Sequence, residues 1–159
     1  MRNADLLFGG LVLALAAALT VSTPARAAGG DLPYWASLTA DTVNMRVGPA
    51  RDYRIVWVYK RKLLPLKVIR LHEGWRLVED PDGARGWVLA RFLSRKQTAI
   101  VQHAAAEMRD KRGAGRLMWR AERGVVGKVG ACESGWCKFD ATGHAAWIKS
   151  DAIWGEGQP

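Results

Sequence analysis

The sequence has 159 residues, with 24 Lys and Arg against 15 Asp and Glu, two cysteines and eight tryptophans. This length allows one medium domain or two very small ones. A composition of 49% hydrophobic and 25% charged residues excludes a wholly disordered, collagen-like or multi-spanning membrane chain. Eight Trp beside three Phe and three Tyr indicate small cores built around a few large rings.

Residues 1–27 have the pattern of an export signal peptide. Arg2 gives a short positive start, residues 6–19 form an apolar stretch, and residues 25–27 (ARA) form a cleavage site. The alternative is an uncleaved anchor, although the apolar stretch is too short for a comfortable membrane span. No later segment is apolar enough to cross a bilayer. We therefore expect a periplasmic or secreted protein with no integral membrane span after cleavage.

The charge of the exported chain narrows the choice of partner. Without residues 1–27 the chain keeps 22 basic and 14 acidic side chains, a formal charge of +8. In a cytoplasmic protein this charge would favour nucleic acid, but export argues against a nucleic-acid partner. Lipid headgroups, lipopolysaccharide phosphates and the carboxylates of cell-wall peptides would all attract a basic domain. The alternative is that the charge serves solubility alone.

The chain contains an internal repeat of about 60 residues. Matching tryptophans are separated by 62, 61 and then 60 residues along the chain: Trp57 and Trp119, Trp75 and Trp136, Trp87 and Trp147. An offset that drifts in single steps is typical of two copies of one fold with one-residue loop deletions. The repeat predicts two domains, about residues 35–96 and 100–155.

Each copy is expected to consist of short strands. In the first copy, β-branched and aromatic runs separated by turn residues predict strands over residues 42–47, 55–59, 66–71, 75–79 and 85–89. No segment after residue 28 has a long apolar pattern of helical period. The predicted fold class is therefore all-β, with two tandem small barrels or sandwiches. The join at residues 94–98 is so short that the domains are expected to pack in a limited relation.

Several motifs resemble those of a known family. Residues 44–49 (NMRVGP), the Gly74–Trp75 pair and residues 86–88 (GWV) resemble the N-x-R-x-G-P, G-W and G-W-V pattern of bacterial SH3-like domains. The chain is similar to exported tandem SH3-like proteins of alphaproteobacterial type over nearly all of residues 35–155, although residues 106–111 (AEMRDK) of the second copy lack the Asn and the Gly-Pro. The resemblance implies a partly open β-barrel of five or six strands per copy and a non-catalytic role. Related domains bind cell-wall peptides or target hydrolases to the wall, but a fold alone does not give a function.

The two cysteines are expected to form a disulfide. Cys132 and Cys137 lie on the two sides of a predicted hairpin, where facing Cα atoms are close enough for a bridge, and the periplasm is oxidising. One alternative is a nucleophilic Cys137 with His144 as its base, which lacks a third orienting residue. Another is a zinc site that includes His72 and His103, which lacks paired ligand spacing.

Other motifs of catalysis are absent from the sequence. It contains no Walker loop, H-E-x-x-H, G-x-S-x-G or dinucleotide fingerprint. Glu79, Asp80 and Asp82 cluster at a Pro-Gly turn, where these residue types suit the backbone. We therefore expect a protein that is not an enzyme and has no cofactor or metal site.

The ligand site is expected among aromatic rings. Trp75 precedes Val78 by three positions, as Trp136 precedes Phe139, so on a strand each Trp faces away from its apolar partner. If those partners fill the barrels, the rings lean into a groove of the kind that docks extended peptides. The candidate ligand-binding residues are Tyr53, Trp57, Tyr59, Trp75 and Trp136. The alternative is that these rings cover the core or the interface between the copies.

The sequence therefore favours a non-catalytic binding module. Its ligand is expected to be peptidoglycan, another cell-envelope ligand or an extended peptide. The basic run at residues 60–62 (KRK) beside Tyr59 would suit an acidic peptide or an anionic glycan, or it is a solvated loop. The alternative function is a structural adaptor for another exported protein.

Overall fold

The computed structural model describes residues 32–159. The export signal expected over residues 1–27 lies outside the described residues. Within the described part, no helix is long and apolar enough to span a membrane.

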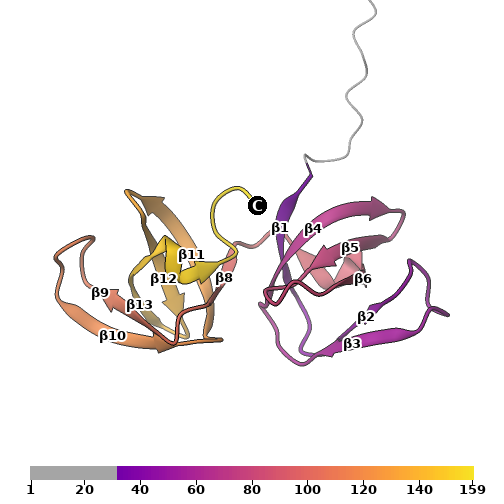
Figure 1. Cartoon of the computed structure of the whole chain (residues 1–159), viewed down its shortest axis with the longest axis horizontal. Helices are drawn as coiled ribbons and strands as arrows, with labels where there is room; N and C mark the ends of the chain where they lie inside the picture. Colours follow the sequence, from indigo (N-terminus) through magenta and orange to yellow (C-terminus); the bar gives the residue numbers. More distant parts are fainter. Residues whose placement is uncertain (1–31) are drawn as a thin grey trace, which may run out of the picture.

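The described chain is all-β and forms two antiparallel sheets that lie side by side (Figure 1). The first consists of β1 (Tyr34–Leu38), β2 (Val43–Arg46), β3 (Ile55–Tyr59), β4 (Pro65–His72), β5 (Trp75–Glu79), β6 (Arg85–Leu89) and β7 (Leu93–Ser94). The second consists of β8 (Thr98–Val101), β9 (Ala105–Arg109), β10 (Leu117–Glu122), β11 (Val126–Glu133), β12 (Trp136–Ala141), β13 (His144–Lys149) and β14 (Ile153–Trp154). Short 3-10 turns at Ala90–Phe92 and Ser150–Ala152 precede the last strand of each sheet.

The two sheets have one topology. The strand order is β3-β2-β6-β5-β4-β1-β7 in the first sheet and β10-β9-β13-β12-β11-β8-β14 in the second. The number of each strand in the second sheet is thus seven higher than the number of the strand at the same place in the first sheet. The tryptophan offsets in the sequence therefore reflect a repeat of the complete fold, as the sequence predicts.

Each sheet curls around its own apolar core. Leu38, Leu66 and Val78 are fully buried in the first core, and Phe139 and Ile148 in the second. The hairpin of β2 and β3 contributes Val43, Met45 and Tyr59 to the first core, and β3 forms the edge of the first sheet (Figure 1).

The hairpin of β11 and β12 contains the expected disulfide. Cys132 lies directly opposite Cys137 in the strand register, and their sulfur atoms are bonded. The two turn residues between the strands, Ser134 and Gly135, both have positive φ angles, 50° and 77°. Two such residues make the tight hairpin turn whose twist matches that of the strands, and it brings the two cysteines together.

The two domains pack directly on each other. Val126 of β11 belongs to the apolar cluster of the first domain. The rings of Trp35 and Trp154 meet edge to face with their centroids 4.5 Å apart, and Trp35 Nε1 donates a hydrogen bond to the carbonyl of Glu156 at 3.1 Å. The C-terminal segment accordingly returns to the space between the sheets, beside β1 (Figure 1). These contacts hold the two domains against each other, in keeping with the restricted domain arrangement that the short join predicts.

Candidate functional site

The edge strand β3 exposes an unusual amount of apolar surface. Every residue from Arg51 to Val58 is exposed. Ile55 and Val58 belong to this run, and Trp57 has 58% of its surface accessible. Proteins ordinarily protect a sheet edge with charges, prolines or a covering loop, and contiguous exposed apolar surface marks interaction sites. The β3 edge is therefore the leading candidate for the functional surface.

A bulge in β3 lies immediately before Trp57. Trp57 lies opposite Met45, whereas Arg46 lies opposite Ile55, so Val56 is an extra residue in the strand. A bulge increases the local twist and changes the direction of the neighbouring side chains. The second domain has the same irregularity, because β10 shifts register immediately before Trp119.

Tyr59 forms the buried floor behind this edge. Its hydroxyl donates to Asp80 Oδ2 at 3.1 Å and lies 3.3 Å from the sulfur of Met45. Asp80 is also buried, and its other oxygen accepts backbone N–H groups of Asp82 at 3.1 Å and Ala84 at 2.8 Å. Burial raises the pKa of Tyr59 well above its usual range, and the neighbouring charge of Asp80 raises it further. Tyr59 thus stays protonated and holds the turn that carries Asp80.

Replacing Tyr59 with phenylalanine is expected to lower the free energy of unfolding by about 1–3 kcal/mol, because the buried carboxylate of Asp80 loses a donor. The wild type should lose stability above about pH 10, where the unfolded tyrosine ionises and the folded one does not. Below that pH the contribution is fully present. Urea denaturation at neutral and alkaline pH measures both effects. Tyr53→Phe, at an exposed ring, is the control, and equal midpoints for the two variants would contradict the prediction.

A pocket of about 220 Å³ adjoins β3 at the domain junction. Its walls come from both domains and include Trp57, Tyr59, Asp82, Gln102 and Arg123. A guanidinium nitrogen of Arg123 lies 4.0 Å from a carboxylate oxygen of Asp82, so the two domains also approach each other through opposite charges at this rim. Gln102 and Arg123 were not found from sequence, because their place depends on how the domains pack.

Basic side chains flank β3 at both ends. Arg54 precedes the strand, and the basic run of residues 60–62 follows it, with all of these side chains exposed. Arg61 donates a hydrogen bond to the carbonyl of Gly124 in the second domain at 2.6 Å. Among the described residues, Arg54, Lys60 and Lys62 form no ion pair. Within residues 32–159, the edge therefore carries three basic side chains that no carboxylate contacts as an ion pair.

The candidate aromatic residues do not form one groove. Trp57 and Tyr59 line the junction pocket, whereas Trp75 lines a different pocket with Leu89 and Phe92. The reason is the strand order, in which β2 and β6 separate β5 from β3, a distance of about 14 Å at the usual strand spacing. Trp136 lines a third pocket, in the second domain.

The expected exposure of Trp75 is wrong. Trp75 is only 8% exposed. It lies opposite Leu89 in the strand register and lines a pocket with Leu89 and Phe92. Tyr59 belongs to the first core, as the alternative in which the rings cover the core requires. Tyr53 is exposed, and its ring lies over Gly48, where a Cβ atom would come within 2.6 Å of it. Whether these residues bind a ligand stays a prediction.

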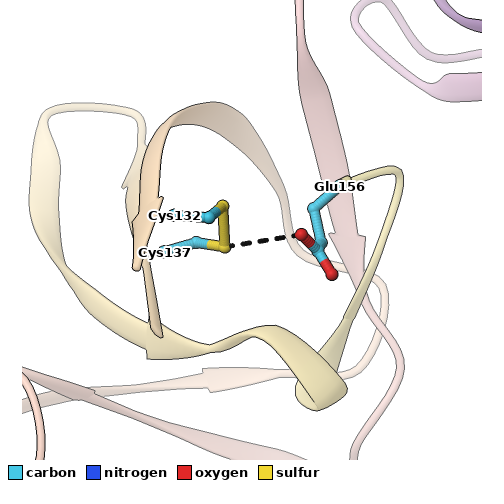
Figure 2. Close-up of side chains that lie close together, drawn as sticks. All are labelled: Cys132, Cys137 and Glu156. Carbon is cyan, nitrogen blue, oxygen red and sulfur yellow. Dashed lines mark hydrogen bonds between the residues drawn. A yellow bond between two sulfur atoms is a disulfide. The ribbon is translucent and has the colours of Figure 1, made fainter. Parts of the chain in front are cut away.

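The disulfide has one acidic neighbour. Oε2 of Glu156 lies 3.8 Å from Sγ of Cys137 and points toward the bridge from the C-terminal segment (Figure 2). A bridged sulfur carries no proton, so Cys137 Sγ donates no hydrogen bond to this carboxylate in the oxidised protein. The bonded sulfur atoms are not available as thiolate nucleophiles or metal ligands.

Comparison with known proteins identifies the family. The sequence model described as "Bacterial SH3 domain" matches residues 39–95 and 105–155. The chain therefore belongs to the bacterial SH3 domain family and carries the domain twice. No curated protein matches the chain.

Solved structures with some similarity are NlpC2 and NlpC1 from Trichomonas vaginalis. Each is 12% identical to this chain with a TM-score of 0.34. The matches cover 78% of this chain but only 48% of NlpC2 and 46% of NlpC1, so this chain spans about half the length of either protein.

Proposed function

We propose that the protein is a non-catalytic binding module of the cell envelope whose ligand is peptidoglycan or another extended envelope ligand. The observation that carries the proposal is the β3 edge, where Trp57 is exposed beside the junction pocket and between basic flanks. An aromatic face can stack on a sugar or a peptide group, and the basic flanks attract carboxylates such as those of cell-wall peptides. The disulfide is in keeping with an oxidising compartment outside the cytoplasm.

The titratable groups near the site have structural partners, which supports a binding role rather than catalysis. Asp80 is held by Tyr59 and by backbone N–H groups. A hydrogen bond from Lys67 lowers the pKa of the neighbouring Glu79, and Arg85 lowers it further. A general acid or base needs a pKa near the working pH and access to a substrate. Asp80 is buried, and Lys67 and Arg85 favour the charged form of Glu79.

The test is sedimentation of the expected exported form, residues 28–159, with purified peptidoglycan sacculi across a salt series. Trp57→Ala is expected to weaken retention by about tenfold, as the loss of a central aromatic contact does. The fold should survive, since Trp57 is mostly exposed. Trp119→Ala removes the counterpart ring of the second domain and is the matched control. Retention of the wild type no greater than that of a charge-matched basic protein would overturn wall binding.

A second candidate function is a structural adaptor for another exported protein. It is favoured by one observation: in the part of the chain that the structure describes, β3 pairs with a strand on one side only. An unpaired strand edge is complemented by the backbone of a polypeptide, which a glycan does not have.

A further inference from the structure

We infer that β3 is a docking edge for an extended, acidic segment of another protein, which adds to the first sheet as an eighth strand. The inference rests on the second candidate function, an adaptor for another exported protein, and specifies the segment of that protein that is bound. It requires three features of β3: a free backbone edge, apolar side chains on both faces, and uncompensated charge at the ends.

The backbone edge of β3 is open. Among the described strands it pairs with β2 alone, so alternate N–H and C=O groups on its other side have no strand partner. The edge at the far end of the same sheet is β7, which has only two residues. Of the two edges, β3 alone is long enough to hold an added strand by several main-chain hydrogen bonds.

The side chains of β3 would pack against such a strand on both faces. Trp57 shares a face with the buried Tyr59, while Val58 lies opposite Asn44 on the other face. An added strand would bury apolar surface on each face, at about 25 cal/mol per Å² removed from water. On the Trp57 face the added strand would continue into the junction pocket, which places Gln102 and Arg123 within its reach.

The charges select an acidic strand and oppose a second copy of this chain. If two β3 strands paired antiparallel about Trp57, Arg54 of each copy would lie opposite Lys60 of the other. Like charges directly opposite in a sheet destabilise the pair. A strand with acidic residues at both ends would instead meet Arg54 at one end and Lys60 and Lys62 at the other.

The counterpart edge β10 is a poorer site, although it carries Trp119 at the equivalent position. Arg120 beside that ring approaches Glu107, and Arg116 before the strand approaches Asp110. The ring of Trp119 also meets His144 edge to face, with the centroids 5.2 Å apart. At β10 the basic side chains thus already face carboxylates and the tryptophan ring already contacts a histidine, so these groups are less available to a partner than those of β3.

The experiment uses the exported protein and a synthetic peptide whose centre alternates valine and threonine and whose two ends are acidic. Amide hydrogen exchange reports strand addition directly, and we expect exchange over residues 55–58 to slow when the peptide is added. Val58→Lys, which places a charge on the pairing edge, should weaken binding by about tenfold. Val47→Lys, at an exposed valine outside β3, should leave binding unchanged.

Charge selection is tested with matched substitutions. Lys60→Glu should weaken binding by about fivefold at low salt, whereas Lys96→Glu, an equal change of net charge at an exposed residue of the domain join, should not. A peptide with lysines at both ends should not bind. Equal binding of the acidic and basic peptides, or acidic-peptide binding without slowed exchange at β3, overturns the inference.

The outcomes separate this inference from the proposed function. Retention on sacculi without peptide binding overturns strand addition and leaves the binding module standing. Failure to bind either probe overturns both. A concentration-dependent dimer in sedimentation velocity that Val58→Lys abolishes would show that a second copy occupies the edge, and would overturn the acidic partner.

Discussion

Replacing Phe139 with alanine is expected to lower the free energy of unfolding of the second domain by about 3–5 kcal/mol, the usual cost of removing a buried phenyl ring. Phe139 is fully buried and is the largest side chain of the second core. A domain of about sixty residues has only about 5 kcal/mol of stability, so the second domain should be largely unfolded. Urea denaturation followed by circular dichroism measures the loss.

Equivalent core positions of the two domains provide a second test of this prediction. In the strand register, Phe139 takes the place that Val78 has in the first domain, and Gly127 the place of Leu66. A Cβ atom on Gly127 would lie 2.6 Å from the ring of Phe139 and 2.7 Å from the backbone oxygen of Asp140, so the ring and the backbone together occupy the space of the missing leucine. Gly127→Leu should therefore be destabilising alone, and should be partly rescued by Phe139→Val, because the pair restores the volume.

A second variant, which removes an exposed ring of the same domain, distinguishes the loss of core packing from the loss of an aromatic ring in general. Trp119→Ala should cost much less than Phe139→Ala, since Trp119 is already partly in water. Equal losses for these two variants, or no rescue in the double variant, would contradict the view that the two cores exchange a leucine for a phenyl ring.

The strands of the first copy could be predicted well because their signals are local. The runs at residues 55–59, 75–79 and 85–89 are strands with these bounds, since β-branched and aromatic residues end at clear turns. β1 (Tyr34–Leu38) and β7 (Leu93–Ser94) were not predicted. β7 has only two residues and is a strand because Ser37 and Leu38 of β1 pair with it, so its signal lies in the tertiary fold.

The site could be predicted only in part, for a related reason. The alternation of side chains along a strand predicts the face of the sheet on which each side chain lies, but it does not predict which other residues pack on that face. Trp75 does lie outside the core cluster of Val78, yet it is only 8% exposed and lies opposite Leu89 in the strand register. The exposure of Trp57 follows from its place on an edge strand, and one sequence does not show which strand lies at the edge of a sheet.

Substituting aspartate for Val126 is expected to destabilise the protein by about 3 kcal/mol, because an unpaired charge replaces a buried apolar side chain. Val126 belongs to the second domain but lies in the apolar cluster of the first, with Leu64 and Leu66. We therefore expect the wild type to unfold in one calorimetric transition and the variant in two. Val47→Asp, at an exposed valine of the first domain, should leave a single transition.

The same substitution tests whether domain packing serves binding. The junction pocket takes Trp57 and Tyr59 from one domain and Gln102 and Arg123 from the other, so a loosened interface separates its walls. Val126→Asp should weaken retention on sacculi at temperatures where both domains are still folded, as circular dichroism would show. Unchanged retention with two separate transitions would mean that β3 binds without the second domain, and that the domains pack for stability alone.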